Sequence, residues 1–166
     1  AVIRRARAFG MTILGNDIVE IDHVFLKENH VEMTGLDDLL QRSDFVSLNC
    51  DLNPTSRHLM NAHTFACMRP TGVLINTARG PIVDEPALVA ALQAGQLAGA
   101  ALDVYEHEPL PASSPLAHMD NVLLAPHNAN SSPAAWERVH FNTLKNLIEG
   151  LGLPIDGLVE AYHNPL

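Results

Sequence analysis

Short, largely apolar runs bounded by glycine, proline or polar residues recur along this chain and limit what it can fold into. Three of them cover residues 73–78, 100–105 and 122–126. Runs of this length predict strands that are buried on both faces, as in a parallel sheet. Segments with helical periodicity separate them, and strands that alternate with helices predict right-handed βαβ crossovers. The predicted fold class is therefore α/β, with a doubly wound parallel sheet.

Helical and extended segments can be placed along most of the chain. Gly10 is expected to end a first helix, and the segment from Ser132 to Gly150 is expected to form the last one. Trp136 belongs to an apolar stripe on that final helix, which predicts a packed face. Strands are expected at residues 11–15, 31–33, 45–50, 73–76, 98–104 and 122–125, and further helices at 36–42, 61–68 and 84–95.

Composition limits the class of partner. The chain has 166 residues, enough for one domain with its own core, and a formal net charge of −9. Such an acidic chain is not expected to bind nucleic acid or an anionic membrane as its main partner. No apolar stretch reaches the roughly 18 residues of a membrane span. The two cysteines, Cys50 and Cys67, lack the spacing of a metal site, so no metal is expected, and they are interpreted as reduced thiols of a cytoplasmic protein.

Three ionisable residues, Arg79, Glu108 and His127, stand just after the three apolar runs. Because the carboxyl ends of neighbouring parallel strands line the ligand crevice of an open α/β sheet, these side chains are expected to converge on one rim. A guanidinium, a carboxylate and an imidazole together can bind an anionic substrate and move a proton. Glu106 is an adjacent rival for the role of Glu108, but the spacing and the following Pro109 favour Glu108. Arg79 by itself is also consistent with a strand-end arginine paired to a helix.

Three segments resemble a known family. Residues 75–80 read Ile-Asn-Thr-Ala-Arg-Gly, residues 102–109 read Leu-Asp-Val-Tyr-Glu-His-Glu-Pro, and residues 125–127 read Ala-Pro-His. In this order and spacing they resemble the nicotinamide-binding domain of the D-isomer-specific 2-hydroxyacid dehydrogenases, which include D-lactate, D-3-phosphoglycerate and glyoxylate/hydroxypyruvate enzymes. The resemblance extends over nearly the whole chain and implies a Rossmann-type sheet.

The resemblance implies a catalytic role for each of the three ionisable residues. Arg79 matches the arginine that binds the carboxylate and carbonyl of the substrate, for which a guanidinium fork is well shaped. His127 matches the acid/base that takes the hydroxyl proton during oxidation and returns it during reduction. Glu108 matches the carboxylate that orients this imidazole. A glutamate here argues against formate dehydrogenase activity, because that subgroup has glutamine at this position.

The resemblance also implies NAD as the cofactor. Asp17 matches the acidic residue that hydrogen-bonds the adenosine ribose hydroxyls, and a carboxylate there repels a 2′-phosphate, which favours NAD over NADP. By itself, Asp17 is also consistent with the cap of a turn. Asp103 matches the acid that accepts a hydrogen bond from the carboxamide. The remaining implied cofactor contacts are Cys50 and Asp51 beneath the nicotinamide ribose, Thr77, Ala78 and Arg79 along the cofactor, and the wall from His127 to Asn130.

Two of these cofactor segments depart from the family pattern. Cys50 and Asp51 stand where relatives more often have Thr or His followed by Pro, and residues 128–130 read Asn-Ala-Asn in place of a mainly apolar segment. The asparagines are consistent either with added polar contacts to the cofactor or substrate or with a simple loop. Neither departure identifies a substrate.

The family has parts that these residues do not include. A first strand and a G-x-G-x-x-G turn precede the helix that ends here at Phe9, and no such motif occurs among the 166 residues. That strand is central in the doubly wound order, so a break is expected between the strands at 11–15 and 45–50. Residues 1–150 are therefore expected to form a partial NAD-binding domain, and residues 151–166 a tail that returns to a substrate domain.

The function implied by the resemblance is hydride transfer between NAD(H) and a small anionic D-2-hydroxy acid or 2-keto acid, in a homodimer. On this interpretation the chain is the C-terminal portion of a larger enzyme and is inactive by itself. Two alternatives stay open. One is a non-catalytic NAD-sensing scaffold, as in the corepressors that resemble this family and keep a similar triad. The other is an inactive fragment that folds only with a partner and exposes apolar surface at its sheet edges.

Overall fold

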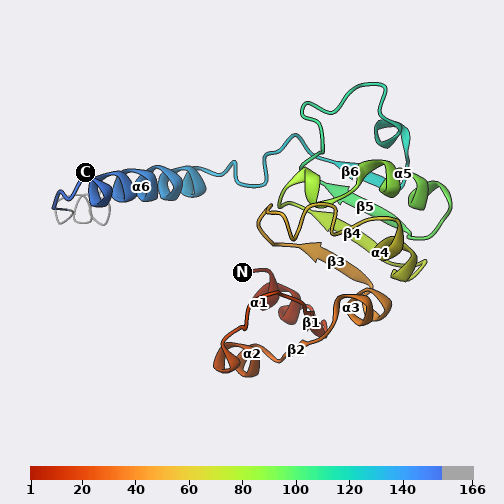
Figure 1. The fold of residues 1–166 in the computed structure, drawn as a ribbon, viewed down its shortest axis with the longest axis horizontal. Coiled ribbons are helices and arrows are strands. Elements are labelled where there is room, and N and C mark those ends of the chain that lie inside the picture. The colour runs from red at the N-terminus through yellow and green to blue at the C-terminus, as the bar shows by residue number, and fades with distance from the viewer. Residues whose placement is uncertain (155–166) are drawn as a thin grey trace. The chain divides into compact units, whose positions relative to one another are not determined.

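The computed structural model describes residues 1–154, which divide into two units (Figure 1). The larger unit is Ala1–His127, and the second begins at Asn128. Of the predicted C-terminal tail, residues 155–166 lie outside the described residues. The predicted boundary of a first domain at residue 150 is not tested by this division.

The larger unit contains the four-stranded parallel sheet that the apolar runs predict. Its strands are β3 (Phe45–Leu48), β4 (Val73–Asn76), β5 (Gly99–Leu102) and β6 (Val122–Leu124), and they lie side by side in chain order. The register pairs Ser47 with Ile75, Ile75 with Ala101, and Ala101 with Leu123. The helical crossovers include α4 (Ala62–Cys67), α5 (Glu85–Gln93) and the 3-10 turns η1 (Gly80–Ile82) and η2 (Pro115–His118).

A separate two-stranded parallel sheet precedes the large one. It pairs β1 (Ile13–Gly15) with β2 (Val31–Met33) and is accompanied by α1 (Val2–Ala8) and α2 (His23–Asn29). Among the described residues no strand joins the two sheets, so the expected break between the strands at 11–15 and 45–50 is present (Figure 1). The Rossmann-like α/β class is therefore confirmed, with its sheet in two parts.

Helix-capping residues account for where the helices begin and end. Asn61 and Thr64 form a reciprocal capping box at the start of α4, and the Asp84 carboxylate accepts a hydrogen bond from the Ala87 N–H at the start of α5. Gly10 follows α1 with φ +76°, a backbone conformation that favours glycine. Helix α2 is absent from the predicted elements, although the Asp22 carboxylate caps it by accepting from the Val24 N–H at 2.8 Å.

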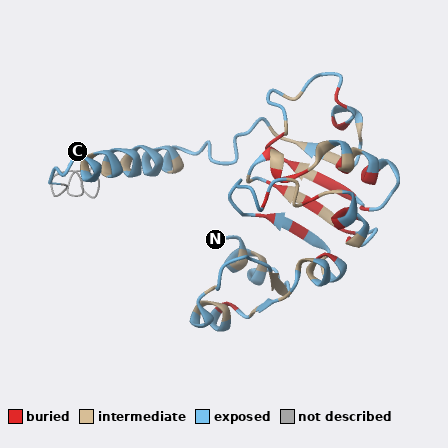
Figure 2. Ribbon diagram, in the orientation of Figure 1, coloured by how far each residue is buried: buried red, intermediate tan, exposed pale blue. Residues whose placement is uncertain are grey.

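The hydrophobic core surrounds the larger sheet. Figure 2 shows the buried residues concentrated on its strands and on the helices beside them. Helix α3 (Leu36–Arg42) contributes Leu40, which is fully buried, and so ties the segment before β3 to this core. The other fully or almost fully buried apolar side chains are Met60, Phe65, Leu74, Ile82, Leu88, Leu97, Val104 and Leu116.

The second unit contains one long helix, α6 (Pro133–Gly150), with the predicted bounds. Ser132 caps it by accepting a hydrogen bond from the Ala135 N–H at 3.2 Å. No residue of α6 is buried, and Trp136 is 52% exposed. Within the second unit the described residues leave this apolar stripe uncovered, and the packed face of the helix stays a prediction. Within residues 1–154, no helix combines the length and the apolar character required to cross a bilayer.

Candidate functional site

Arg79, Glu108 and His127 follow three adjacent strands of the larger sheet. Arg79 comes after β4, Glu108 after β5 and His127 after β6, and the three strands run parallel in that order. All three residues therefore belong to the loops at the carboxyl edge of the sheet, as the sequence predicts. Within that edge, two of the three residues, Glu108 and His127, are in direct contact.

The contact joins Glu108 to His127. Nδ1 of His127 lies 2.8 Å from Oε2 of Glu108, while Oε1 of Glu108 accepts a hydrogen bond from the Tyr105 N–H at 3.0 Å. The hydrogen bond from His127 is the main cause that holds the pKa of Glu108 below its usual value, and the Tyr105 N–H adds to it. Because an ionised carboxylate only accepts hydrogen bonds, Nδ1 carries a proton and Nε2 is left for another partner. The imidazole of His127 is thus oriented by Glu108, and its Nε2 is available to a ligand.

The backbone at His127 has an unusual conformation. Its φ is 53°, in the left-handed region that few residues other than glycine adopt. Such a conformation costs of order 1–3 kcal/mol, and it persists only where surrounding contacts enforce it. The contact with Glu108 is one of these, and it fixes the direction of a side chain that remains 48% exposed. A ligand can therefore reach the ring.

Tyr105 holds the two loops together. Its hydroxyl donates to the Ala125 carbonyl at 2.6 Å and lies 3.2 Å from the Leu102 carbonyl, which links the ends of β5 and β6. Burial raises the pKa of this phenol, and the nearby carboxylates of Asp103 and Glu108 act in the same direction. The role of Tyr105 cannot be inferred from the sequence, because it depends on a carbonyl twenty residues further along the chain.

A hollow of about 640 Å³ opens beside the Glu108–His127 pair. Its wall is mainly apolar, with one carboxylate and one imidazole, a composition typical of sites for small organic ligands. Its lining residues are Tyr105, Glu108, Pro109, Leu110, Leu124, Ala125, Pro126 and His127. The loops after β5 and β6 thus form both the proton-transfer pair and the space next to it.

Arg79 is exposed on the neighbouring loop. Asn76, which is 1% exposed, braces this loop by accepting from the Ala78 N–H and donating to the Arg79 carbonyl, both at 3.0 Å. The Arg79 guanidinium itself donates to the Ala78 carbonyl at 2.6 Å. Within the described residues no hydrogen bond or ion pair joins Arg79 to Glu108 or His127. The structure therefore brings two of the three predicted catalytic residues into contact and leaves the third nearby on the same edge.

The rival acid, Glu106, has a different partner. Its Oε1 lies 2.7 Å from Nε2 of His58, and its Oε2 accepts a hydrogen bond from the Glu85 N–H at 3.3 Å. Burial raises the pKa of Glu106, but the hydrogen bonds from His58 and Glu85 together outweigh it and keep the pKa below its usual value. Glu108, and not Glu106, is therefore the carboxylate placed against His127.

The predicted cofactor residues occupy loops at the carboxyl ends of both sheets. Asp17 follows β1 and accepts a hydrogen bond from the Val19 N–H at 3.2 Å, while Cys50 and Asp51 follow β3. Burial raises the pKa of Cys50, and the carboxylates of Asp17 and Asp51 raise it further. Asp17 and Cys50 follow strands of different sheets.

The other predicted cofactor residues divide between the two units. Thr77 is exposed, Ala78 is half-buried, and Asp103 is 5% exposed at the end of β5, close enough to raise the pKa of Tyr105. Asn130 belongs to the second unit, so its relation to the hollow stays a prediction. The larger unit carries the carboxylate of Asp17 after β1 and a mainly apolar hollow beside β6, and groups of these kinds suit the polar and ring parts of an elongated cofactor.

Comparison with known proteins identifies the family to which this chain belongs. Residues 1–129 match the family model described as "D-isomer specific 2-hydroxyacid dehydrogenase, NAD binding domain". A glyoxylate reductase from Korarchaeum cryptofilum is 44% identical over 148 residues, which is 89% of this chain and 44% of that protein. The chain thus spans less than half the length of this curated relative.

Solved structures of 2-hydroxyacid dehydrogenases and reductases are similar to this chain as well. A glyoxylate reductase from Paecilomyes thermophila has a TM-score of 0.81 at 37% identity, covering 88% of this chain and 44% of that chain. A D-lactate dehydrogenase with NAD+ from Lactobacillus jensenii has a TM-score of 0.80 at 27% identity, covering 92% and 49%. The family resemblance stated from the sequence motifs is confirmed by these matches.

Proposed function

Because the chain belongs to the D-isomer specific 2-hydroxyacid dehydrogenase family, we propose that it forms the cofactor-binding part of an enzyme that transfers hydride between NAD(H) and a small 2-hydroxy or 2-keto acid. The observation that carries the proposal is the 2.8 Å contact between His127 and Glu108, at the rim of a mainly apolar hollow. A positioned acid/base next to a space for a small ligand is what this reaction requires.

In this proposal His127 moves the proton of the reaction. A bound nicotinamide supplies or accepts the hydride, and the protein must handle the proton at the substrate oxygen. During oxidation, Nε2 of His127 takes the hydroxyl proton, and during reduction it gives a proton to the carbonyl oxygen. Glu108 holds Nδ1 throughout, so that Nε2 faces the reacting oxygen in both directions. Tyr105 supports this arrangement by donating its N–H to Glu108.

Arg79 binds the substrate anion in the same proposal. A guanidinium forms paired hydrogen bonds with a carboxylate, and this fixes the orientation of the neighbouring carbonyl. The exposed side chain at the end of β4 and the buried Asn76 beneath its loop support the assignment. The net charge of −9 does not oppose it, because a small anion responds to the local charge at the rim.

NAD is the proposed cofactor. Asp17 would bind the ribose hydroxyls of the adenosine half, and its carboxylate would disfavour the 2′-phosphate of NADP. Asp103 would hold the carboxamide of the nicotinamide. The further proposed contacts are Cys50, Asp51, Thr77, Ala78, Arg79, His127 and Asn130.

The proposed substrates are glyoxylate and hydroxypyruvate. The support is the 40% to 44% identity to proteins named glyoxylate reductase and glyoxylate/hydroxypyruvate reductase B. We also propose a cytoplasmic homodimer. Two cysteines without a disulfide are consistent with a reducing compartment, and light scattering of the purified protein tests the dimer.

The deciding experiment is a titration with NADH of the larger enzyme of which this chain is proposed to be the cofactor-binding part, followed by assays of that enzyme with a panel of 2-keto acids. We expect saturable NADH binding, consumption of NADH with glyoxylate or hydroxypyruvate, and a loss of about 10²- to 10⁴-fold in rate for His127→Gln. NADH binding by this variant should persist. His23→Gln, which replaces an exposed histidine on α2, is the matched control. Turnover that survives in His127→Gln, or NADH binding with no turnover on any acid of the panel, would overturn the proposal.

A further inference from the structure

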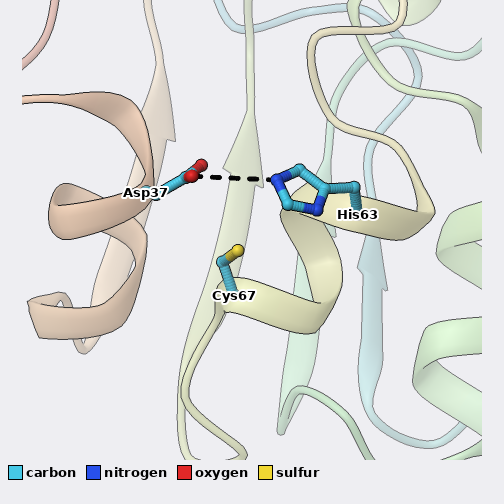
Figure 3. A group of neighbouring side chains, drawn as sticks. All are labelled: Asp37, His63 and Cys67. Atoms are coloured by element: carbon cyan, nitrogen blue, oxygen red, sulfur yellow. Dashed lines mark ion pairs between the residues drawn. The ribbon is translucent and has the colours of Figure 1, made fainter.

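Helices α3 and α4 bring together three side chains that the proposed reaction does not use. These are Asp37 of α3 and His63 and Cys67 of α4, and one ligand atom of each lies within 4.8 Å of the others. Figure 3 shows Asp37 and His63 pointing toward each other, with the Cys67 sulfur beside the same space. None of the three lines the hollow next to His127.

The two helices hold these side chains in place. His63 and Cys67 are four residues apart on α4, so they lie on the same face of that helix. The capping box at Asn61 fixes the start of α4, and Cys67 packs partly against the hydrophobic core. Helix α3 contacts α4 and is anchored by the fully buried Leu40. The donors therefore stand on two packed elements rather than on loops.

The distance between the two exposed donors suits a shared ion better than a direct bond. Oδ2 of Asp37 lies 3.7 Å from Nε2 of His63, which is too long for a hydrogen bond. Tetrahedral zinc with its usual bond lengths separates its ligand atoms by roughly 3.3–3.6 Å. Small rotations of exposed side chains would bring the three donors into this range.

No other group in the described structure neutralises Asp37. The adjacent Asp38 accepts hydrogen bonds from Thr34 at 2.6 Å and Arg42 at 2.7 Å. Within residues 1–154, no lysine or arginine pairs with Asp37, and neither His63 nor Cys67 forms a side-chain hydrogen bond. Of these two neighbouring carboxylates, Asp38 is therefore paired with Thr34 and Arg42, and Asp37 is the one that faces α4.

We propose that Asp37, His63 and Cys67 bind one divalent transition-metal ion of the Zn²⁺ type, with water as a fourth ligand. A set of one nitrogen, one oxygen and one sulfur donor favours Zn²⁺ or Co²⁺ over Mg²⁺ and Ca²⁺, which prefer oxygen alone. The ion would link α3, which follows the small sheet, to α4, which follows the first strand of the large sheet. Its effect is to stabilise the packing of these two helices.

The test uses CoCl₂ as a spectroscopic probe on the purified protein after treatment with a chelator. We expect one equivalent of Co²⁺ to give a thiolate-to-metal charge-transfer band that ZnCl₂ removes. Cys67→Ala should abolish the band. His63→Ala and Asp37→Asn should each weaken binding by at least about tenfold, because even residues that only support a ligand typically contribute 10- to 100-fold. No band in the unmodified protein, or a band that survives in Cys67→Ala, would overturn the proposal.

Matched controls separate this site from other donors. Cys50→Ala removes the other thiol, and His23→Ala removes an exposed histidine of α2, and both variants should keep the band. If Cys67→Ala fails to fold, Asp37→Asn decides the question, since it changes only the charge of an exposed side chain. An unchanged Co²⁺ affinity in Asp37→Asn would contradict the assignment. The measurement does not depend on NADH or on turnover, so it is independent of the proposed function.

Discussion

Nδ1 of His127 lies 2.8 Å from Oε2 of Glu108, and this contact joins the loops that follow two adjacent strands. Neither loop could position the pair alone, because each contributes one partner. Tyr105 also links the ends of these strands, because its hydroxyl donates to the Ala125 carbonyl at 2.6 Å. If the pair acts as one unit in the proposed reaction, the two side chains should not contribute independently.

A double-mutant cycle tests this dependence. Glu108→Gln should slow NADH-dependent reduction by about 10²-fold or more, because the imidazole loses the charged partner that orients it. Glu108→Gln combined with His127→Gln should be no slower than His127→Gln alone. Steady-state rates of the four proteins give the result. If the two losses multiply instead, the residues act separately and the proposed role of Glu108 is wrong.

A second pair, His58 and Glu106, is predicted to stabilise the fold rather than to take part in the reaction. Glu106→Gln should lower the free energy of unfolding by about 1–2 kcal/mol near neutral pH, since it removes the charge from a hydrogen-bonded side chain that is only 16% exposed. The folded-state pKa of Glu106 lies below the usual glutamate value of 4.5. Its contribution is therefore fully present above that value and is lost as the pH falls through the lowered pKa.

Urea unfolding at several pH values measures this linkage. The difference in stability between the unmodified protein and Glu106→Gln should be constant near neutrality and should shrink below about pH 4.5. Glu20→Gln, at an exposed position, is the control and should change stability by no more than about 0.5 kcal/mol. A difference that grows as the pH falls would mean that the folded protein does not favour the ionised form of Glu106.

The positions of β4 and β5 could be predicted because short apolar runs indicate strands that are covered on both faces. The strands at 31–33 and 73–76 and the bounds of α6 agree with the predictions. Predicted strands at 45–50 and 98–104 are longer than β3 and β5. The apolar pattern continues past the last ladder hydrogen bond, because residues such as Val104 stay buried while their backbone turns into the site loops.

The site could be predicted only where it follows from strand order. The convergence of Arg79, Glu108 and His127 on one edge follows from parallel neighbouring strands. Spacing and the following Pro109 favour Glu108 over Glu106 in the sequence. The structure adds the physical reason, because Glu108 meets His127 and Glu106 meets His58. The proposed metal site could not be predicted, since Asp37 and His63 come together only through the packing of two helices.

The core of the larger sheet offers a direct comparison between two leucines on parallel strands. Leu74 in β4 is fully buried, whereas Leu123 in β6 is 71% exposed. Leu74→Ala should lower the free energy of unfolding by about 2–5 kcal/mol, because it removes buried methyl groups and leaves a cavity. Leu123→Ala should change it by no more than about 0.5 kcal/mol. Equal losses in urea titrations would mean that Leu123 is covered in solution.

Gly80 lies against the loop that carries Glu108. A Cβ atom at this position would overlap the carbonyl group of Tyr105, which is backbone and cannot rotate away. The N–H of Tyr105 donates to Glu108, so any shift of this residue also moves the carboxylate that faces His127. The absence of a side chain at residue 80 is therefore a condition for the geometry of the pair.

Gly80→Ala is accordingly predicted to affect both stability and the proposed activity. Overpacking against fixed backbone should cost at least about 1–3 kcal/mol of unfolding free energy, and the displaced carboxylate should lower the rate of 2-keto acid reduction in the protein that remains folded. Gly35→Ala is the matched control, because its Cβ would meet nothing within 4 Å and its φ is −66°. As a helix N-cap it should cost no more than about 1 kcal/mol and leave the rate unchanged. A Gly80→Ala protein that melts and turns over like Gly35→Ala would show that the loop can relax without disturbing Glu108.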